Sequence, residues 1–538
     1  MFASNTAFPL LTATAVLPAV GAILTAAVPA ARRTAAKWLA LAFSLATLVL
    51  AALVVVRFEP GGDRYQLTES HAWIPDFGVR YELGVDGIAV ALIALTALLI
   101  PFIILAGWHD ADPLAVSDSG SAAGKSSRWR PTQGFFALIL MVEAMVILSF
   151  EATDVFLFYI FFEAMLIPMY FLIGGFGDRA HAGTDGAAAT QRSYAAVKFL
   201  LYNLAGGLIM LAAVVGLYVV AGSFSLAEIA EARASGELEM ATNTERLLFL
   251  GFFFAFAVKA PLWPLHTWLP NAMGEATAPV AVLITAVVDK VGTFAMLRFC
   301  LQLFPEASKW ATPVIIVLAL VSIVYGALLA VGQRDIKRLI AYASISHFGF
   351  IVLGIFAMTS QGQSGATLYM VNHGISTAAL MLVAGFLITR RGSRLIADYG
   401  GVQKVAPVLA GTFLVGSLAT LSLPGLAPFV SEFLVLVGAF AAYPVAGVIA
   451  TLGIVLAALY TLVLYQRTMT GPVKAEVRAM PDLKARELVV VAPLIALLLL
   501  LGVFPKPLTD IVNPAVQHTM NDVRKTDPTP EIEAEAAK

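Results

Sequence analysis

The sequence predicts an all-α polytopic membrane protein of about 14 transmembrane helices, with two inverted five-helix repeats and broken helices at the seventh and twelfth positions. Hydrophobic residues make up 59% of the 538 residues, and the mean hydropathy is +0.85. Charged residues make up 13%, about half of the roughly 25% that is usual in soluble domains. Together with a net charge of -1, these values exclude a disordered chain, a set of soluble domains and a nucleic-acid binder with a basic surface.

Recurring apolar runs identify the individual spans. A membrane helix needs about 20 mostly apolar residues. The run at 407–440 is too long for one crossing, so we expect a broken helix there. The predicted spans are 7–29, 36–56, 84–107, 133–150, 154–176, 194–221, 246–266, 276–304, 310–331, 337–358, 364–388, 407–440, 445–468 and 487–504.

Lysine and arginine alternate between the predicted loops. Alternate loops, beginning with the first, contain 20 of the 34 basic residues, whereas the other loops contain 6. Because cytoplasmic loops are enriched in Lys and Arg, both termini are predicted on the outer side of the membrane. The alternation persists to the last span, which favours fourteen crossings.

The spans group into repeats by position. Each proline-interrupted span is the fourth in a unit of five, and an odd number of spans gives the two units opposite orientations. A Ser/Gly/Ala-rich segment predicts a mobile cytoplasmic loop, and the acidic C-terminal end predicts disorder. The predicted parts are spans one to three (1–107), the mobile loop (108–132), the first repeat (133–304), the second repeat (305–468), a cytoplasmic loop with span fourteen (469–512) and the disordered tail (513–538).

The sequence offers no site for a cofactor. Cys300 is the only cysteine, so this chain alone can hold neither a disulfide nor an iron–sulfur cluster. No nucleotide-binding P-loop or dinucleotide fingerprint occurs. The histidines within spans lack a second ligand at metal spacing. We therefore expect no cofactor or metal in this chain, and an energy source in partner subunits.

Charged residues inside spans are the main functional candidates, because each costs about 2.5–3.5 kcal/mol at a helix centre on insertion scales. Lys259 lies well inside its span, and Pro261 and Pro264 should break the helix after it. Glu163 lies mid-span without a basic residue within one turn, so Lys259 is its natural partner. Burial together would favour the charged form of each group. The alternative is a purely structural link between two helices.

A second lysine and two carboxylates lie deep in other spans. Lys290 is a candidate proton site, and the adjacent Asp289 should have a different partner because neighbouring helical residues do not face each other. A structural salt bridge is the simpler interpretation of Asp289. Glu143 is a secondary candidate that could pair with a basic residue on a neighbouring helix. Lys198 and Arg298 lie nearer span ends, where snorkelling explains them.

Two histidines and a further glutamate complete the candidates. His347 and His373 can accept and release protons near neutral pH. The alternative for each is a hydrogen-bonded core histidine. Glu432 follows the second helix interruption, which contains Pro424 and Pro428. A line of titratable groups at membrane depth is what a proton path requires.

These stretches resemble the antiporter-like membrane subunits of respiratory complex I, the proton-pumping NADH:quinone oxidoreductase, and within that family the M (chain 4) type. The resemblance covers nearly all of the core from the third span onward. The motifs that carry it are FFEAMLIPMYFLIGGFG (162–178), KAPLWPLHTWLPNAMGEATAPV (259–280), AYASISHFGF (341–350), VNHGIS (371–376) and LPGLAPFVSEF (423–433).

The resemblance implies one proton channel per subunit, driven by electron transfer and quinone chemistry elsewhere. NADH, FMN, the iron–sulfur clusters and quinone would be bound by partner subunits. The family commonly has HTWLPDAH where this chain has Asn271 and Met273, which puts a proton-input role of that loop in doubt. Carried over by position, the proton-transfer residues would be the pair Glu163 and Lys259, the central Lys290, the connecting His347 and His373, and the terminal Glu432.

The resulting hypothesis is a translocase subunit of complex I in a bacterial inner membrane. Its partners would be other membrane-arm subunits, especially the antiporter-like L and N types, together with lipids, and no nucleic acid. One rival is a subunit of a multisubunit Na+/H+ antiporter. Another is a structural membrane-arm spacer, against which the number and depth of the intramembrane charges argue.

Overall fold

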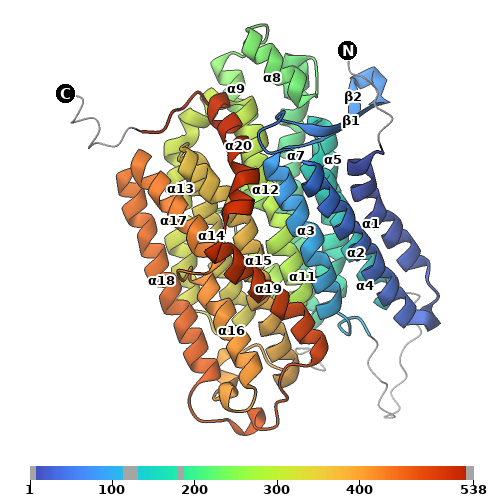
Figure 1. The fold of residues 1–538 in the computed structure, drawn as a ribbon, viewed down its shortest axis with the longest axis vertical. Coiled ribbons are helices and arrows are strands. Elements are labelled where there is room, and N and C mark those ends of the chain that lie inside the picture. The colour runs from blue at the N-terminus through green and yellow to red at the C-terminus, as the bar shows by residue number, and fades with distance from the viewer. Residues whose placement is uncertain (1–7, 113–130, 178–186, 529–538) are drawn as a thin grey trace.

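The computed structural model describes residues 8–112, 131–177 and 187–528 as an elongated bundle of helices (Figure 1). Most helices run along the long axis. A small two-stranded sheet and the short helix α8 (Leu226–Ser235) lie at one end of the bundle, which we call the hairpin end. The predicted class, a mainly helical protein with many membrane spans, is confirmed.

The N-terminal part contains a β-hairpin that the sequence did not predict. The Glu69 carboxylate on its first strand accepts hydrogen bonds from the backbone N–H groups of Leu11 (2.9 Å) and Thr12 (3.2 Å). These donors have no partner within their helix, so Glu69 caps the first helix. The elements are α1 (Leu10–Ala27), α2 (Arg33–Arg57), β1 (Gln66–Ile74), β2 (Val79–Val85) and α3 (Gly87–Ala106).

The middle of the chain has short and irregular helices where the candidate residues lie. Two segments have π-helical geometry, which is frequent at functional sites. The elements are α4 (Pro131–Glu151), α5 (Val155–Ala164), α6 (Leu166–Gly175), α7 (Ala187–Ala221), α8, α9 (Thr242–Lys259), α10 (Leu269–Glu275), α11 (Ala278–Val282), the π-helix η4 (Leu283–Val288), α12 (Asp289–Ala295) and the π-helix η5 (Met296–Leu301).

The C-terminal half is more regular. It has one interruption between two short helices, inside the predicted broken span. The elements are α13 (Pro305–Val331), α14 (Ile336–Phe356), α15 (Ser360–Arg391), α16 (Pro407–Thr420), α17 (Ala427–Ala442), α18 (Pro444–Met469), α19 (Ala485–Val503) and α20 (Lys506–Asp522).

Twelve helical segments among the described residues are long and apolar enough to cross a membrane. The other two predicted spans coincide with α9, which carries three charged residues, and with the short helices α16 and α17. The count of fourteen and the two repeats stay predictions. Ala278–Leu301 and α15 are completely enclosed over their apolar windows, whereas α19 is 28% buried. The protein interior is therefore built around these two segments.

The prediction of disorder over 513–538 is wrong for 513–522, which belong to α20. Val512, Val516 and Met520 recur every four residues and form a buried face against α3 and α15. Asp522 also pairs with Arg64 at 2.6 Å. The acidic composition concealed this amphipathic spacing. Residues 529–538 of the predicted tail, and 113–130 of the predicted mobile loop, lie outside the described residues.

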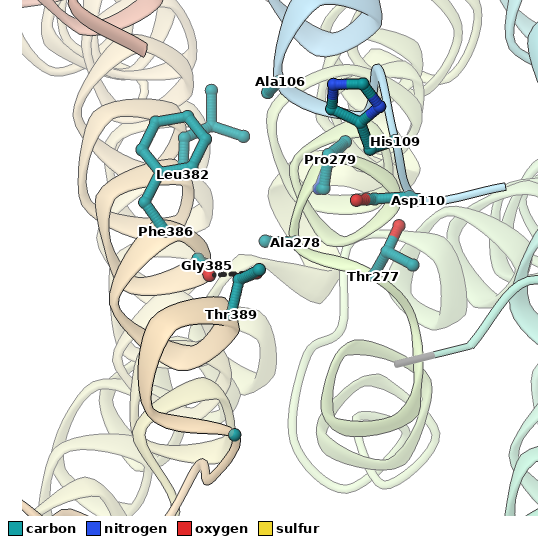
Figure 2. A pocket seen from close by; sticks show the side chains of 11 residues that line it. Ala106, His109, Asp110, Thr277, Ala278, Pro279, Leu382, Gly385, Phe386 and Thr389 are labelled. Atoms are coloured by element: carbon teal, nitrogen blue, oxygen red, sulfur yellow. Dashed lines mark hydrogen bonds between the residues drawn. The ribbon is translucent and has the colours of Figure 1, made fainter. Parts of the chain in front are cut away.

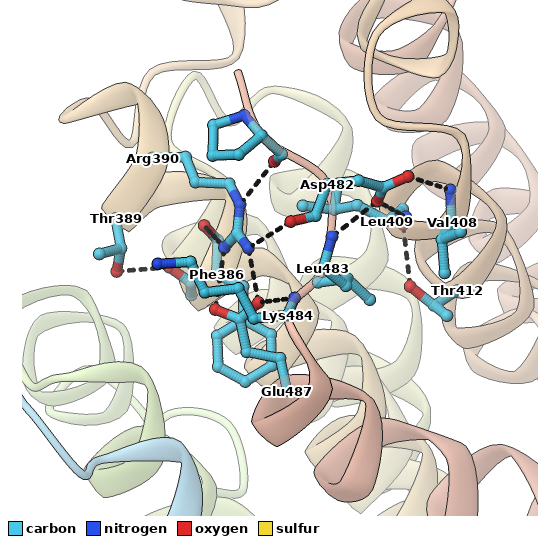
Figure 3. A network of polar contacts seen from close by, with 12 residues as sticks. Phe386, Thr389, Arg390, Val408, Leu409, Thr412, Asp482, Leu483, Lys484 and Glu487 are labelled. Atoms are coloured by element: carbon cyan, nitrogen blue, oxygen red, sulfur yellow. Dashed lines mark hydrogen bonds and ion pairs between the residues drawn. The ribbon is translucent and has the colours of Figure 1, made fainter. Parts of the chain in front are cut away.

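A polar network closes the end of the bundle opposite the hairpin (Figure 3). The Arg390 guanidinium makes two hydrogen bonds to Glu487, at 3.1 and 2.5 Å, and donates to three backbone carbonyls. The neighbouring Asp482 carboxylate accepts the N–H groups of Val408 (2.9 Å) and Leu409 (2.8 Å) at the start of α16. Arg390, Glu487 and Asp482, which we call the Arg390 clamp, thus join the ends of α15, α16 and α19.

Candidate functional site

The first predicted pair lies where two helices are interrupted. Pro168 cannot donate a hydrogen bond to the preceding turn, and the helix carrying Glu163 is divided between α5 and α6 at Met165. Lys259 is the last residue of α9, and Pro261 and Pro264 lie in the non-helical stretch that follows. The proline spacing therefore marks the end of α9 correctly.

The Lys259 ammonium group is bound by a backbone carbonyl of the interrupted helix α5. Its side chain is 1% exposed. The Nζ atom donates a 2.8 Å hydrogen bond to the carbonyl oxygen of Phe162 and lies 3.8 Å from the centre of that ring. The C-terminal end of α9 also carries partial negative charge, which favours a cation there. Lys259 is held by a carbonyl, an aromatic face and a helix end.

Glu163 lies close enough to Lys259 for a Coulombic interaction but makes no hydrogen bond to its ammonium group. Neither carboxylate oxygen of Glu163 has a hydrogen-bond partner among the described residues. The carboxylate instead packs against Gly207 of α7, where an added Cβ would overlap Oε1. Gly207 thus provides the space that the carboxylate occupies beside Lys259.

Replacing Gly207 with alanine should displace the Glu163 carboxylate and lower proton translocation about threefold, because small displacements of a reacting group reduce rates steeply. Gly206→Ala is the matched control, since a Cβ there would meet its nearest atom, Cα of Ala255, at 3.2 Å and leave Glu163 untouched. The measurement is NADH-driven proton uptake by inverted membrane vesicles. Equal uptake by the two variants would contradict the positioning of Glu163 by Gly207.

Lys290 is connected to the second half of the chain by a direct contact. Its Nζ lies 2.7 Å from Nδ1 of His373 and 4.2 Å from the ring centre of Phe348. Asp289 is fully buried, neither of its oxygens has a hydrogen-bond partner among the described residues, and its charge is felt by both Lys259 and Lys290. The expected salt bridge of Asp289 is therefore not formed among the described residues, and its carboxylate interacts with the two lysines only through longer-range electrostatics.

A continuous hydrogen-bonded chain leads from His347 to Glu432. His347 Nδ1 lies 2.6 Å from the hydroxyl of Tyr369, and this hydroxyl donates to Glu432 Oε2 at 2.8 Å. Ser422, in the interruption between α16 and α17, donates to the same oxygen. Sequence reasoning missed Tyr369 and Ser422. Tyr369 precedes His373 by four residues, so their shared helix face was the signal that could have revealed it.

His347 and His373 lie side by side, and so the contact of Lys290 with His373 is followed by the hydrogen bonds from His347 to Glu432. The ring centres of His347 and His373 are 5.3 Å apart, and the Nε2 atoms of both have no hydrogen-bond partner among the described residues. Both rings are buried. The structure thus brings together Lys290, His373, His347 and Glu432, whereas Lys259 and Glu163 make no direct contact with these four residues and interact with Asp289 or with each other only electrostatically.

The prolines of the second interruption lie where they were expected. Pro424 is in the non-helical stretch after α16, and Pro428 is in the first turn of α17, where a missing N–H costs no helical hydrogen bond. Asn271 and Met273, which depart from the family pattern, belong to α10. Met273 is fully buried, so this short helix packs one of its side chains into the protein interior.

Three further charged residues, Arg298, Lys198 and Glu143, have different surroundings. Arg298 does not snorkel: its side chain is 1% exposed, pairs with Asp86 at 3.1 Å and donates to Phe150 O at 2.9 Å. Nη1 also donates to the carbonyl of Ala152 at 3.3 Å, whereas Nη2 is held by the ion pair alone and Nε has no hydrogen-bond partner among the described residues. Lys198 is partly exposed and lies over two tyrosine rings. Glu143 is fully buried without a basic partner among the described residues, so its expected pairing is wrong.

A cavity of about 370 Å³ lies between α3, α11 and α15 at the end opposite the hairpin (Figure 2). His109, Asp110 and Thr277 lie on one side of it, and Phe386 and Thr389 on the other. None of the six predicted proton-transfer residues lines the cavity. In the described part of the chain, no three His, Cys, Asp or Glu residues are grouped so that they could hold a metal ion.

Broken helices that carry a buried line of titratable side chains define a proton- or cation-translocating membrane subunit. The family model described as NADH:quinone oxidoreductase/Mrp antiporter, TM, matches residues 152–457. NADH-quinone oxidoreductase subunit M of Mycobacterium tuberculosis is 55% identical over 535 residues, covering 96% of this chain and 95% of the relative. NADH-ubiquinone oxidoreductase chain 4 of Arabidopsis thaliana is 33% identical, with 93% and 95% covered.

The solved structures agree. A chain of respiratory complex I from Thermus thermophilus with bound NADH matches with a TM-score of 0.82 and 30% identity, covering 95% of this chain and 99% of that one. A chain of the Mrp complex from Dietzia matches with a TM-score of 0.77 and 21% identity over 95% of this chain and 52% of that one, which shows the fold alone. The chain belongs to the NADH:quinone oxidoreductase/Mrp antiporter family, in its subunit M (chain 4) branch.

Proposed function

We propose that this chain is the proton-translocating M-type membrane subunit of an NADH:quinone oxidoreductase and moves protons through its buried titratable line. The observation that carries the proposal is the contact series from Lys290 to His373 and from His347 through Tyr369 to Glu432. Close spacing of proton donors and acceptors in an enclosed interior is what proton transfer needs.

Each residue has a distinct role in this proposal. Glu163 controls the charge state of Lys259 electrostatically, and Asp289 couples Lys259 to Lys290. The two histidines relay the proton, and Glu432 passes it on. The proposed proton-transfer residues lie on α5, α9, α12, α14, α15 and α17. In this proposal, displacement of any one of these helices would change the distance between successive proton donors and acceptors.

Electron transfer belongs to other subunits. The enzymatic role of this chain is that of a subunit of a proton-translocating NADH:quinone oxidoreductase. NADH, FMN, iron–sulfur clusters and quinone would be bound by partners. The membrane-arm partners would include the antiporter-like L and N types, and lipids would cover the outward apolar faces. Localisation would be the bacterial inner membrane with both termini on its outer side, which the Lys/Arg alternation supports.

The rival antiporter function has weaker support. The Mrp-complex chain is 21% identical to this one, whereas the relatives at 33% and 55% identity are named as oxidoreductase subunits. A structural spacer would have no use for buried carboxylates without hydrogen-bond partners among the described residues, because each is costly.

Replacing Lys290 with methionine in the assembled complex should lower NADH-driven proton uptake about tenfold, because the ammonium group that contacts His373 directly is lost. The same replacement at the partly exposed Lys198 should leave uptake near the wild-type value. Proton uptake per NADH oxidised by inverted vesicles is the readout, with assembly checked on native gels. Wild-type uptake in an assembled Lys290→Met complex would overturn the proposed path.

A further inference from the structure

Among the residues that the structure describes, Tyr369 is the side chain that forms hydrogen bonds with both His347 and Glu432. Its hydroxyl lies 2.6 Å from His347 Nδ1 and 2.8 Å from Glu432 Oε2. No hydrogen bond joins His347 to Glu432 directly. The tyrosine is 1% exposed, so it belongs to the interior rather than to a surface.

The direction of these hydrogen bonds follows from the atoms involved. A phenol has one hydrogen to donate, and an ionised carboxylate can only accept. The Tyr369 hydrogen is therefore directed to Glu432, and the phenolic oxygen accepts a hydrogen from Nδ1 of His347. This orders the three groups as donor, relay and acceptor.

Ser422 and Tyr460 show what is special about Tyr369. Ser422 also donates to Glu432 Oε2, but it does not reach a histidine. Tyr460 of α18 is buried and lies close enough to Glu432 for an electrostatic interaction, yet its hydroxyl has no hydrogen-bond partner among the described residues. Of these three hydroxyls, Tyr369 has contacts on both sides.

We propose that the Tyr369 hydroxyl is a proton-carrying residue that links His347 to Glu432. In this step the Nδ1–H bond of a protonated His347 breaks and a new O–H bond forms at Tyr369. At the same time the original phenolic proton forms an O–H bond at Glu432 Oε2. His347 becomes neutral, Glu432 becomes neutral, Tyr369 is regenerated, and no electrons are exchanged.

The proposal rests on the proposed function and adds a third member to its last transfer. It is distinct from a packing role, because the ring contacts of Tyr369 with Phe350 and His373, both at 6.3 Å between ring centres, need no hydroxyl. Phenylalanine keeps those contacts and removes only the proton carrier.

Tyr369→Phe in the assembled complex should lower the protons taken up per NADH oxidised at least about fivefold, because His347 and Glu432 lose their common hydrogen-bond partner. Tyr460→Phe is the matched control: it removes a buried hydroxyl that has no hydrogen-bond partner among the described residues and should leave this ratio unchanged. A wild-type ratio in Tyr369→Phe, with Lys290→Met impaired, would overturn the role of Tyr369 alone. Wild-type ratios in both would overturn the whole path.

A second substitution keeps the hydroxyl and changes its acidity. Incorporation of 3-fluorotyrosine at position 369 makes the phenol a better proton donor without altering the hydrogen-bond pattern. The rate of proton uptake should change measurably at position 369 and stay constant when the same residue is placed at 460. Identical rates at both positions would contradict proton transfer through Tyr369, even if Tyr369→Phe failed to assemble.

Discussion

Lys259→Ala should reduce proton uptake about a hundredfold, since it removes the buried cation that interacts electrostatically with Glu163. Because electron transfer is coupled to pumping in the proposed function, NADH:quinone turnover should fall with it. Both quantities are measured on inverted vesicles that contain the assembled complex.

Lys259→Arg distinguishes the role of the positive charge at this position from the role of proton release. Arginine keeps a cation at this position but does not release its proton in proteins. The arginine variant should therefore assemble like the wild type and still fail to pump. Lys198→Ala, at a partly exposed lysine over two tyrosine rings, is the control and should have a small effect. Normal pumping by Lys259→Arg would leave Lys259 with an electrostatic role only.

Arg390→Ala should have the largest effect on stability. The variant leaves the Glu487 carboxylate, whose side chain is 7% exposed, without its cation, and removes the donors of three backbone carbonyls. Removing one partner of a buried ion pair costs about 3–5 kcal/mol. We expect little assembled complex in the membrane and a lower midpoint of thermal disassembly for what remains.

The neighbouring Arg391 provides the comparison for the Arg390 clamp. Its guanidinium makes one hydrogen bond, at 3.3 Å, to the carbonyl of Asp398, so Arg391→Ala should disassemble near the wild-type temperature. The double variant Arg390→Met/Glu487→Leu should recover much of the lost stability, because no unpaired charge is left buried. If Arg390→Ala matched Arg391→Ala in abundance and midpoint, the clamp would have no stabilising role.

Apolar run length was sufficient to predict the twelve spans that the structure shows among its described residues, because it is a property of the chain in a bilayer. The orientation drawn from the Lys/Arg alternation stays a prediction. The proline pairs marked the two interruptions for a similarly local reason. The hairpin and α20 were not anticipated, because the cap that Glu69 places on α1 and the packing of α20 against α3 depend on neighbours distant in sequence.

The sequence nominated the charged residues of the candidate site but did not reveal their contacts. Lys259, Lys290 and Glu432 were conspicuous because a charge deep in a span is costly. The hydrogen bond of Lys259 to a backbone carbonyl could not be predicted, because every residue has such a carbonyl whatever its side chain. Tyr369 was missed because a tyrosine in an apolar helix is usually core. Arg298 was misjudged because distance from a span end says nothing about a carboxylate on another helix.

The complete enclosure of Ala278–Leu301 has a consequence for biogenesis. This segment carries Asp289, Lys290 and Arg298, and on insertion scales each charge costs about 2.5–3.5 kcal/mol at a helix centre facing lipid. A single helix of this sequence exposed to lipid is therefore unfavourable while the later part of the chain is still being synthesised. Its entrance into the membrane must be shared with segments that shield it: α9 is made before it, and α15 only afterwards. The residues proposed to move protons thus make membrane insertion of this subunit a cooperative event.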